Sequence, residues 1–317
     1  LGALKYVAGG WEHCTIRVLP TGKVELVTGT SPHGQGHETA WSQIASDTLG
    51  IPVDDIEVIH GDTRTSPYGM DTYGSRSLAV GGQAILRAGE KVVEKARLIA
   101  AHQLECSAND LEFDNGVFRV KGDPSKEKAI QAVAFEAFSA HDLPDGLEPT
   151  LQAESTVDPQ DFSYPHGTHL CAMEVDTETG KSTIRSYVCV DDIGIQINPL
   201  IVEGQVHGGL AQGIAQALYE GAVYDSDGQL LTASFADYLV PSAPDLPSFV
   251  TDHTVTPSTT NPLGTKGVGE AGAIASTPAD INAIVDALRP YGVNDVPMPA
   301  LPMTVWRTLN AARQGGK

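Results

Sequence analysis

Residues 14–50 read "CTIRVLPTGKVELVTGTSPHGQGHETAWSQIASDTLG" and place two β-rich runs, a glycine-rich loop and a helical pattern in direct succession. A Pro-Thr-Gly-Lys turn separates the two runs and predicts a hairpin over 14–29. Apolar residues then recur at helical spacing between His37 and Gly50, where the pattern ends. The loop "GTSPHGQGHET" (29–39) therefore joins a strand to a helix N-terminus, and its three glycines leave the backbone bare at that junction.

The rest of the first half contains further strand and helix patterns. Residues 55–61 ("DIEVIHG") predict a strand, 75–105 one long helix rich in Ala, Val and Leu, and 111–120 ("LEFDNGVFRV") a second hairpin with Asn-Gly at its tip. Residues 121–165 are richer in Pro, Asp and Glu and less periodic, so we expect a linker and surface excursion there.

Similar patterns return in the second half. Residues 169–190 alternate in hydrophobicity and turn at a Thr-Gly pair, which predicts another hairpin. A helical pattern follows and opens with "EGQVHGG" (203–209), so Gly204–His207 repeats the Gly-Gln-x-His pattern of Gly34–His37 at a second predicted junction of hairpin and helix. The match indicates a weak structural duplication, although two short matches among 33 glycines can also arise by chance.

The pattern of elements also predicts the fold class. Hairpins combined with long helices, without regular alternation of single strands and helices, indicate an α+β fold with mixed or antiparallel sheets. At 317 residues the chain has the length of about two ordinary domains. We therefore expect two α+β subdomains, over 1–150 and 151–317.

Composition excludes several classes of protein. The 40 acidic and 20 basic residues give a formal net charge of −20, which repels a phosphate backbone, so nucleic acid is not expected as a partner. No apolar run approaches the roughly 20 residues that a membrane span requires. The composition, with 41% hydrophobic residues, is ordinary for a soluble globular protein.

The cysteines are widely spaced. Cys14, Cys106, Cys171 and Cys189 never form C-x-x-C, so the sequence encodes neither a zinc ribbon nor an iron–sulfur cluster. We expect reduced, mostly buried thiols in a cytoplasmic protein. The chain starts with Leu-Gly-Ala, without an initiator Met or a signal-peptide pattern, and we expect it to begin in mid-protein.

Glycine gathers in four clusters at predicted element boundaries: 29–38, 72–82, 191–199 and 264–272. Glycine lets the backbone approach a ligand and direct successive N–H groups at anionic oxygens, and a helix N-terminus adds its dipole. Any one cluster is explained as turn glycines. Four together, several of which carry Gln, Ser, Arg or Lys, favour a phosphate-bearing cofactor.

Common motifs do not account for these clusters. Residues 29–36 have the glycine spacing of a P-loop but lack its Lys and Ser/Thr. Gly267–Gly272 spells G-x-G-x-x-G, yet no buried parallel strand precedes it, as a Rossmann motif requires. His33 and His37 have the spacing of helical zinc ligands, but Gly34 and Gly36 disfavour a helix between them, so a metal held by these side chains is not expected.

Five blocks of sequence carry a family resemblance. They are "GTSPHGQGHETAWSQIASDTLGIPVDDIEVIHGDT", "DTYGSRSLAVGG", "FSYPHGTHLCAMEVDTETG", "DDIGIQINPLIVEGQVHGGLAQGIAQALYE" and "GTKGVGEAG". Together and in this order they resemble the molybdenum hydroxylases, the xanthine oxidase and aldehyde oxidase family, and are most similar to the large subunit of the aerobic carbon monoxide dehydrogenase type. Only the C-terminal, molybdopterin-binding part of that subunit is matched. The resemblance implies molybdopterin-binding subdomains over 1–150 and 151–317, with the catalytic glutamate loop in the second.

The resemblance also implies the site. The loop around Gln35 and the 266–269 segment would contact the molybdenum-bearing pterin, "TYGSRS" (72–77) its diphosphate, and Asp191 or Asp192 the nucleotide base or ribose. No side chain would bind molybdenum directly, because the pterin dithiolene holds it. The implied cofactor-binding residues are Gly34, Gln35, Gly36, His37, Thr72, Tyr73, Gly74, Ser75, Arg76, Ser77, Asp191, Asp192, Ile197, Gln205, Lys266, Gly267, Val268 and Gly269.

Glu270 is the implied catalytic residue. The sequence gives it no place in a predicted helix or strand, because "STPAD" (276–280) predicts the next helix start, with Thr277 as cap and Pro278 at the first position. From the residues alone it is a solvated loop acid. In the family's "GVGEAG" context a glutamate acts as general base in an oxidation that takes its oxygen from water, with an aldehyde, an N-heterocycle or carbon monoxide as substrate.

The resemblance further implies a molybdopterin cytosine dinucleotide and several partners. These are the N-terminal half of the large subunit, an iron–sulfur small subunit with [2Fe-2S] clusters and a medium subunit with FAD, in a cytoplasmic dimer of heterotrimers or a larger assembly. Two alternatives are a NAD-dependent dehydrogenase that uses Gly267–Gly272, and a binding or structural subunit without a cofactor. Metal analysis of the purified complex separates the subunit without a cofactor from a molybdenum enzyme.

Overall fold

The computed structural model describes residues 10–66 and 68–315. The chain divides into two compact units. Unit 1 takes the chain up to Tyr164 together with Ile195–Asn198 and Pro257–Gly267, and unit 2 takes Pro165–Gly194, Pro199–Thr256 and the chain from Val268 onward. Both units combine helices with mixed or antiparallel sheets, so the predicted α+β class is confirmed. The predicted subdomains 1–150 and 151–317 concern cofactor binding and stay a prediction.

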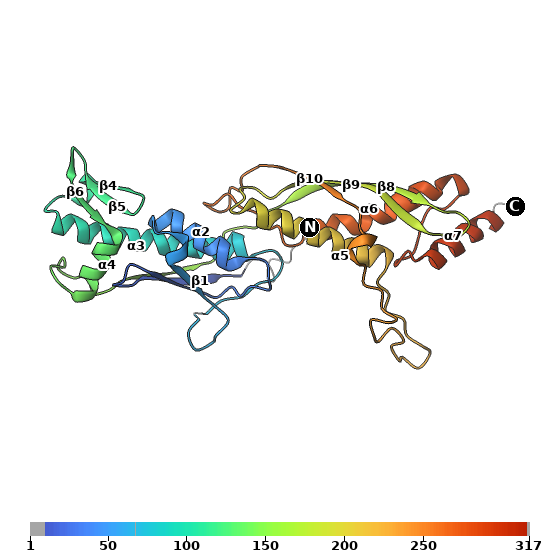
Figure 1. Ribbon diagram of the computed structural model, residues 1–317, viewed down its shortest axis with the longest axis horizontal. Coiled ribbons are helices and arrows are strands. Elements are labelled where there is room, and N and C mark those ends of the chain that lie inside the picture. The colour runs from blue at the N-terminus through green and yellow to red at the C-terminus, as the bar shows by residue number, and fades with distance from the viewer. Residues whose placement is uncertain (1–9, 67, 316–317) are drawn as a thin grey trace. The chain divides into compact units, whose positions relative to one another are not determined.

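Unit 1 is built on a four-stranded sheet of order β3-β2-β1-β7, of which Figure 1 labels β1. Strands β1 (Glu12–Val18) and β2 (Val24–Thr28) form the predicted hairpin, β7 (Leu151–Val157) pairs antiparallel with β1, and β3 (Ile56–Ile59) pairs parallel with β2. Helices α2 (His37–Leu49) and α3 (Gly82–Gln103) pack on this sheet, and a π-helical turn, η2 (Ser77–Gly81), leads into α3.

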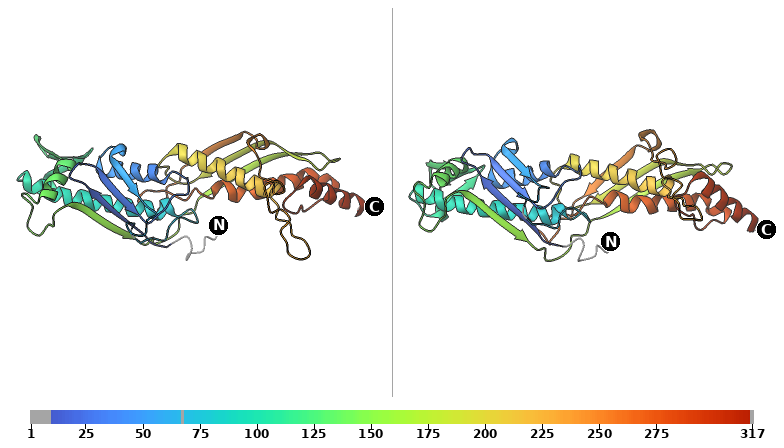
Figure 2. Two further views of the ribbon diagram at one scale, coloured as in Figure 1. Left: turned by 60° about the horizontal axis from the view of Figure 1, so that its bottom comes forward. Right: turned by 90° about the horizontal axis from the view of Figure 1, so that it is seen from below.

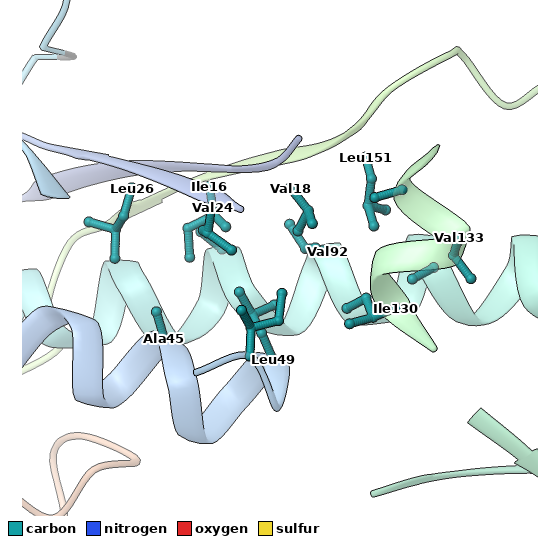
Figure 3. Packing of buried hydrophobic residues seen from close by; sticks show 14 of the residues in the cluster. Ile16, Val18, Val24, Leu26, Ala45, Leu49, Val92, Ile130, Val133 and Leu151 are labelled. Atoms are coloured by element: carbon teal, nitrogen blue, oxygen red, sulfur yellow. The ribbon is translucent and has the colours of Figure 1, made fainter. Parts of the chain in front are cut away.

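The core of unit 1 follows from the spacing of apolar residues along its strands and helices. Alternate residues of β1 and β2 point to one face, where they meet the apolar sides of α2 and α3 (Figure 3). The labelled side chains in that view are Ile16, Val18, Val24, Leu26, Ala45, Leu49, Val92, Ile130, Val133 and Leu151.

A smaller sheet, β4-β5-β6, completes unit 1. Strands β4 (Leu111–Asp114) and β5 (Val117–Val120) form the predicted Asn-Gly hairpin, followed by β6 (Asp123–Ala129) and helix α4 (Ile130–Ser139). Short 3-10 turns, η1 (Val53–Asp55) and η3 (Ala108–Asp110), precede β3 and β4. Gly50, the left-handed C-cap of α2, packs so closely on this hairpin that a Cβ there would lie 1.9 Å from the amide nitrogen of Gly116.

The predicted linker over 121–165 is wrong. This segment contains β6, α4 and β7, and it contributes Ile130, Val133 and Leu151 to the core with no exposed surface. Its polar composition misled the prediction because β6 is mostly solvent-exposed and because α4 buries only one of its faces.

Unit 2 has a three-stranded sheet of order β10-β9-β8. Strands β8 (His166–Val175) and β9 (Ser182–Asp192) form the predicted hairpin, and β10 (Phe249–Thr254) runs parallel to β9. Helix α6 (Ala271–Leu288) packs on this sheet and on α5 (Pro199–Leu218), and Figure 2 shows α5 and α6 side by side. The turns η4 (Ala243–Asp245) and η5 (Arg289–Tyr291) and helix α7 (Pro302–Gly315) complete the unit.

Two predicted helix starts in unit 2 are wrong. Helix α5 begins at Pro199, so Gly204–His207 lies inside a helix and does not occupy a junction equivalent to that of Gly34–His37. Helix α6 begins at Ala271 and contains Pro278, while the Thr277 hydroxyl donates to the backbone oxygens of Gly213 and Ala273 and does not cap the helix. Packing against α5 holds this helix together although proline removes one intrahelical donor.

Among the described residues no helix is both long and apolar enough to cross a membrane.

Candidate functional site

Three glycine-rich segments of unit 1 gather at the N-terminus of α2. Gly34 and Gly36 both take left-handed backbone angles, with φ of 96° and 76°, which glycine adopts without steric cost. Helix α2 begins at His37 with Gly36 as its N-cap and without a side-chain capping bond. The helix dipole favours an anionic acceptor at this start, although the Glu38 carboxylate already accepts from its own backbone amide in the first turn.

Residues 71–77 lie against this loop. The carboxylate of Asp71 accepts a hydrogen bond from the amide of Ser31 at 2.8 Å. Gly74 and Ser75 are both left-handed, with φ of 55° and 56°, so the backbone turns sharply just before η2. A second helical N-terminus thus lies within the same group of loops.

Gly267 brings in the third segment. A Cβ on Gly267 would lie 2.4 Å from the backbone oxygen of Ser75 and 2.6 Å from its Cβ, so only glycine fits there. The neighbouring Lys266 is buried, with 6% of its surface exposed. Ile197 is half-buried and lies in a short segment beside this loop, where the amide of Ile195 donates to the backbone oxygen of Gly264. Unit 1 therefore brings together predicted site residues from four separate parts of the chain.

Arg76 is buried and its terminal nitrogens are engaged within unit 1. Its guanidinium contacts Glu12 and donates to the backbone oxygens of Asp71, Gly10 and Trp11. Burial raises the pKa of Glu12, and the adjacent guanidinium opposes that rise. Arg76 holds the start of the 71–77 segment against β1, and its predicted contact with phosphate stays a prediction.

His37, the first residue of α2, is 7% exposed and stacks on Trp41 with 4.7 Å between ring centroids. Burial lowers its pKa to about 4, and the charge of Glu38 offsets only part of that shift. The imidazole is therefore neutral at pH 7. The neutral ring therefore adds no positive charge to the start of α2.

The other predicted residues lie in unit 2. Asp191 and Asp192 end β9 and are both buried. Burial alone would raise the pKa of Asp191, but hydrogen bonds from His169 and Cys189 outweigh it and hold that pKa below its usual value. Asp192 accepts bonds from the Gly194 amide at 3.1 Å and the Thr254 hydroxyl at 3.0 Å.

Glu270 is the N-cap residue of α6 and is exposed. Of the neighbouring predicted residues, Val268 is half-buried and Gly269 exposed, while Gln205 lies half-buried within α5. Glu270 lies outside the helix as predicted, but α6 starts directly after it and not at 276–280. The catalytic role of Glu270 stays a prediction.

Sequence reasoning missed the buried partner of Arg76. Glu12 lies at a core-facing position of β1, in phase with Cys14, Ile16 and Val18. Strand alternation alone places its side chain inward, and an inward carboxylate needs a cationic or donor partner. That signal was available in the sequence.

A cleft of about 750 Å³ lies elsewhere in unit 1, lined by Gln83 and Arg87 of α3, by 155–160 at the end of β7 and directly after it, and by 259–262. None of the predicted site residues lines it.

Residues 3–247 match the family model described as molybdopterin cofactor-binding domain. The chain belongs to this family. The carbon monoxide dehydrogenase large chain of Hydrogenophaga pseudoflava is 45% identical over 301 residues, which are 95% of this chain and 37% of that relative. This molybdopterin cofactor-binding chain thus spans little more than a third of the length of that relative.

Solved structures agree with the family match. The reconstituted carbon monoxide dehydrogenase from Oligotropha carboxidovorans superposes with a TM-score of 0.92 and 40% identity, covering 98% of this chain and 40% of that one. Quinoline 2-oxidoreductase from Pseudomonas putida 86 superposes with a TM-score of 0.89 and 37% identity, covering 95% of this chain and 38% of that one. The resemblance to the molybdenum hydroxylases is confirmed, as is its restriction to part of the large subunit.

The residues of unit 1 fit a phosphate-bearing pterin. Left-handed glycines at 34 and 36, a helix start whose N-cap has no side chain and the glycine contact at Ser75 keep bulky side chains away from the backbone at these positions. The NAD-dependent alternative lacks its strand, because β10 ends at Thr254 and the described residues 255–270 form no further strand before α6.

Proposed function

We propose that this chain is the C-terminal part of the catalytic large subunit of a molybdenum-dependent hydroxylase or dehydrogenase. The match to the molybdopterin cofactor-binding family over 3–247, together with the loops gathered at α2, carries this proposal. The cofactor is molybdopterin cytosine dinucleotide, which supplies a redox-active metal able to accept two electrons while water provides the oxygen atom. Its substrate is carbon monoxide, an aldehyde or an N-heterocycle, and the relatives named above are a carbon monoxide dehydrogenase and a quinoline oxidoreductase.

This chain's residues would hold the cofactor mainly with backbone groups. The N–H groups around Gly34 and Gly36 and at the start of α2 would bind its anionic oxygens, and the Gln35 amide can both donate and accept. Ser75 would add a hydroxyl donor at the second helical N-terminus, while the buried Ser77 hydroxyl donates to Thr72 at 2.9 Å and would hold this segment in shape. Arg76 would act by keeping this segment in place.

Glu270 is the proposed general base. A carboxylate at the exposed N-cap of α6 can take a proton from the attacking oxygen once a partner chain covers it. General base catalysis contributes typically about 10²–10⁴-fold to rate.

Partner chains are also proposed: the N-terminal half of the large subunit, an iron–sulfur subunit and an FAD subunit, in a cytoplasmic dimer of heterotrimers or a larger assembly. Large apolar side chains support such contacts. Phe235 is 87% exposed, Tyr224 60% and Val240 56%, all within the loops between α5 and β10. A chain that exposes such groups is suited to bind another polypeptide there.

The test is co-expression of this chain with the missing half and the electron-transfer subunits. We expect molybdenum and cytosine dinucleotide in the assembled complex and little of either on the single chain. In Glu270→Gln, both contents should persist while substrate reduces the metal at least about 100-fold more slowly. Glu178→Gln, at an exposed acid on the β8–β9 turn, is the matched control and should react at the wild-type rate.

Two results would count against this function. Substantial turnover by the single chain would mean that no second half is needed. Rapid metal reduction in fully loaded Glu270→Gln would show that Glu270 is not the general base.

A further inference from the structure

One face of the β8–β9 hairpin in unit 2 carries an unusual set of side chains. His169 of β8 lies opposite Cys189 of β9, and Cys171 lies opposite Tyr187. Alternate residues on each strand share a face, so the four side chains lie together. Asp191, two residues beyond Cys189, continues the same row. Helix α6 packs on this hairpin.

Three of these groups form a close triangle. The Cys189 Sγ lies 3.1 Å from His169 Nε2 and 3.1 Å from Asp191 Oδ2, and His169 Nε2 lies 3.3 Å from Asp191 Oδ1. The thiol and the Nε2 position carry at most one proton each, while the triangle has three edges. Hydrogen bonds therefore account for at most two of these three short separations.

The outer nitrogen of the imidazole is also engaged. His169 Nδ1 lies 3.1 Å from the hydroxyl of the buried Tyr187. A hydrogen bond at the far nitrogen is the usual way in which a metal-binding histidine is oriented. It directs Nε2 toward Cys189 and Asp191.

A second observation points to a cation in this region. Asp280 of α6 has no exposed surface, and apart from an interaction with the weak Cys171 thiol donor its carboxylate oxygens have no hydrogen-bond partner of good geometry among the described residues. Its charge acts on His169, Cys171 and Tyr187. An ionised carboxylate that is buried with only a thiol as donor is costly unless a positive charge lies nearby.

The backbone leaves room for the Asp191 carboxylate. Gly167 pairs with Asp191 across the hairpin, and a Cβ on Gly167 would lie 1.9 Å from Asp191 Oδ1. Any other residue at 167 would displace the carboxylate from the triangle.

We propose that His169, Cys189 and Asp191 form a metal site for a zinc-like divalent cation, with Asp280 as a further buried carboxylate beside it. Nitrogen, sulfur and oxygen ligands together suit zinc, whose bonds of about 2.0–2.3 Å place tetrahedral ligand atoms roughly 3.3–3.7 Å apart. The observed triangle needs to open by only a few tenths of an ångström. On binding, the thiol loses its proton to solvent and the cation links β8 to β9 beneath α6. The site lies within unit 2 and does not depend on the proposed molybdenum chemistry.

The test is the zinc content of the purified protein, measured by elemental analysis after incubation with zinc and extensive dialysis. We expect about one tightly held zinc per chain, a rise in Tm with zinc and a fall with chelator. Cobalt(II) in place of zinc should give the near-ultraviolet charge-transfer absorption of a thiolate ligand. Cys189→Ser should lose the zinc and the cobalt band, whereas Cys106→Ser, at a cysteine in unit 1, should keep both.

The wild-type measurement decides the proposal even if Cys189→Ser fails to fold. Less than about a tenth of an equivalent of zinc in wild-type protein, or cobalt bound without a thiolate band, would refute it. Zinc retained in a folded Cys189→Ser would likewise refute it, because the zinc would then be bound outside this triangle.

Discussion

Replacement of Asp280 by Asn tests the electrostatics of the unit 2 core. Asp280 lies inside α6 with no exposed surface and faces His169 and Cys171 of β8 and Tyr187 of β9. Burial raises the pKa of its carboxyl to about 7 from an ordinary 3.8, and the Cys171 thiol and the charge of His169 offset only part of that rise.

The sign of the effect follows from linkage. Because the folded-state pKa is raised, the folded protein holds a proton that the unfolded chain releases. The contribution of Asp280 to stability is therefore fully present below pH 3.8 and is lost as the pH rises to about 7. Each pKa unit corresponds to about 1.4 kcal/mol, so the loss between pH 5 and pH 8 is of order 2–3 kcal/mol.

The assay compares the unfolding of wild type and Asp280→Asn at pH 5 and pH 8, with chelator present so that no bound metal contributes. Asparagine cannot ionise, so the stability of the variant relative to wild type should rise by about 2–3 kcal/mol from pH 5 to pH 8. Any cost of burying the amide is the same at both pH values and cancels. Asp286→Asn, on the exposed side of the same helix, should show no such change. Parallel pH profiles for wild type and Asp280→Asn would refute this reasoning.

Three further predictions concern unit 1. Glu12→Gln should lower the stability of unit 1 by about 3–5 kcal/mol in thermal unfolding, because it leaves the Arg76 guanidinium buried beside a neutral amide, and an unchanged Tm would contradict the ion pair. Leu49→Ala should lower it by about 2–5 kcal/mol through a cavity between α2 and the sheet, whereas a loss under about 1 kcal/mol would mean that the core closes over the gap. Gly267→Ala should push the 266–267 loop away from Ser75, so that the assembled complex retains less cofactor while circular dichroism shows an intact fold; wild-type molybdenum content would argue against this contact.

Much of the local structure could be predicted from the sequence. The hairpins over 14–29, 111–120 and 169–190 and the helix that starts at His37 are confirmed, because spacing of apolar residues and turn residues act within a few positions of the chain. The family resemblance is confirmed for a similar reason, since it rests on residues in order along the chain.

Tertiary packing determined the secondary structure of two segments whose local sequence pattern was ambiguous. Residues 121–165 are polar enough to suggest a linker, yet β7 pairs with β1 and buries Leu151, a contact between segments more than a hundred residues apart. Helix α6 includes Pro278, against local preference, because its apolar face packs on α5 and on the β8–β9 sheet.

For the candidate site, too, some features follow from the sequence and others only from the tertiary structure. The sequence by itself determined which loops are rich in glycine and which residue types they carry, because these are properties of short segments. Only the tertiary structure decided that Gly267 touches Ser75, that Arg76 is engaged by Glu12, and that Cys189 closes a triangle with His169. Such contacts join residues on separate strands and loops, and their distances depend on strand register and helix packing, which no local spacing encodes.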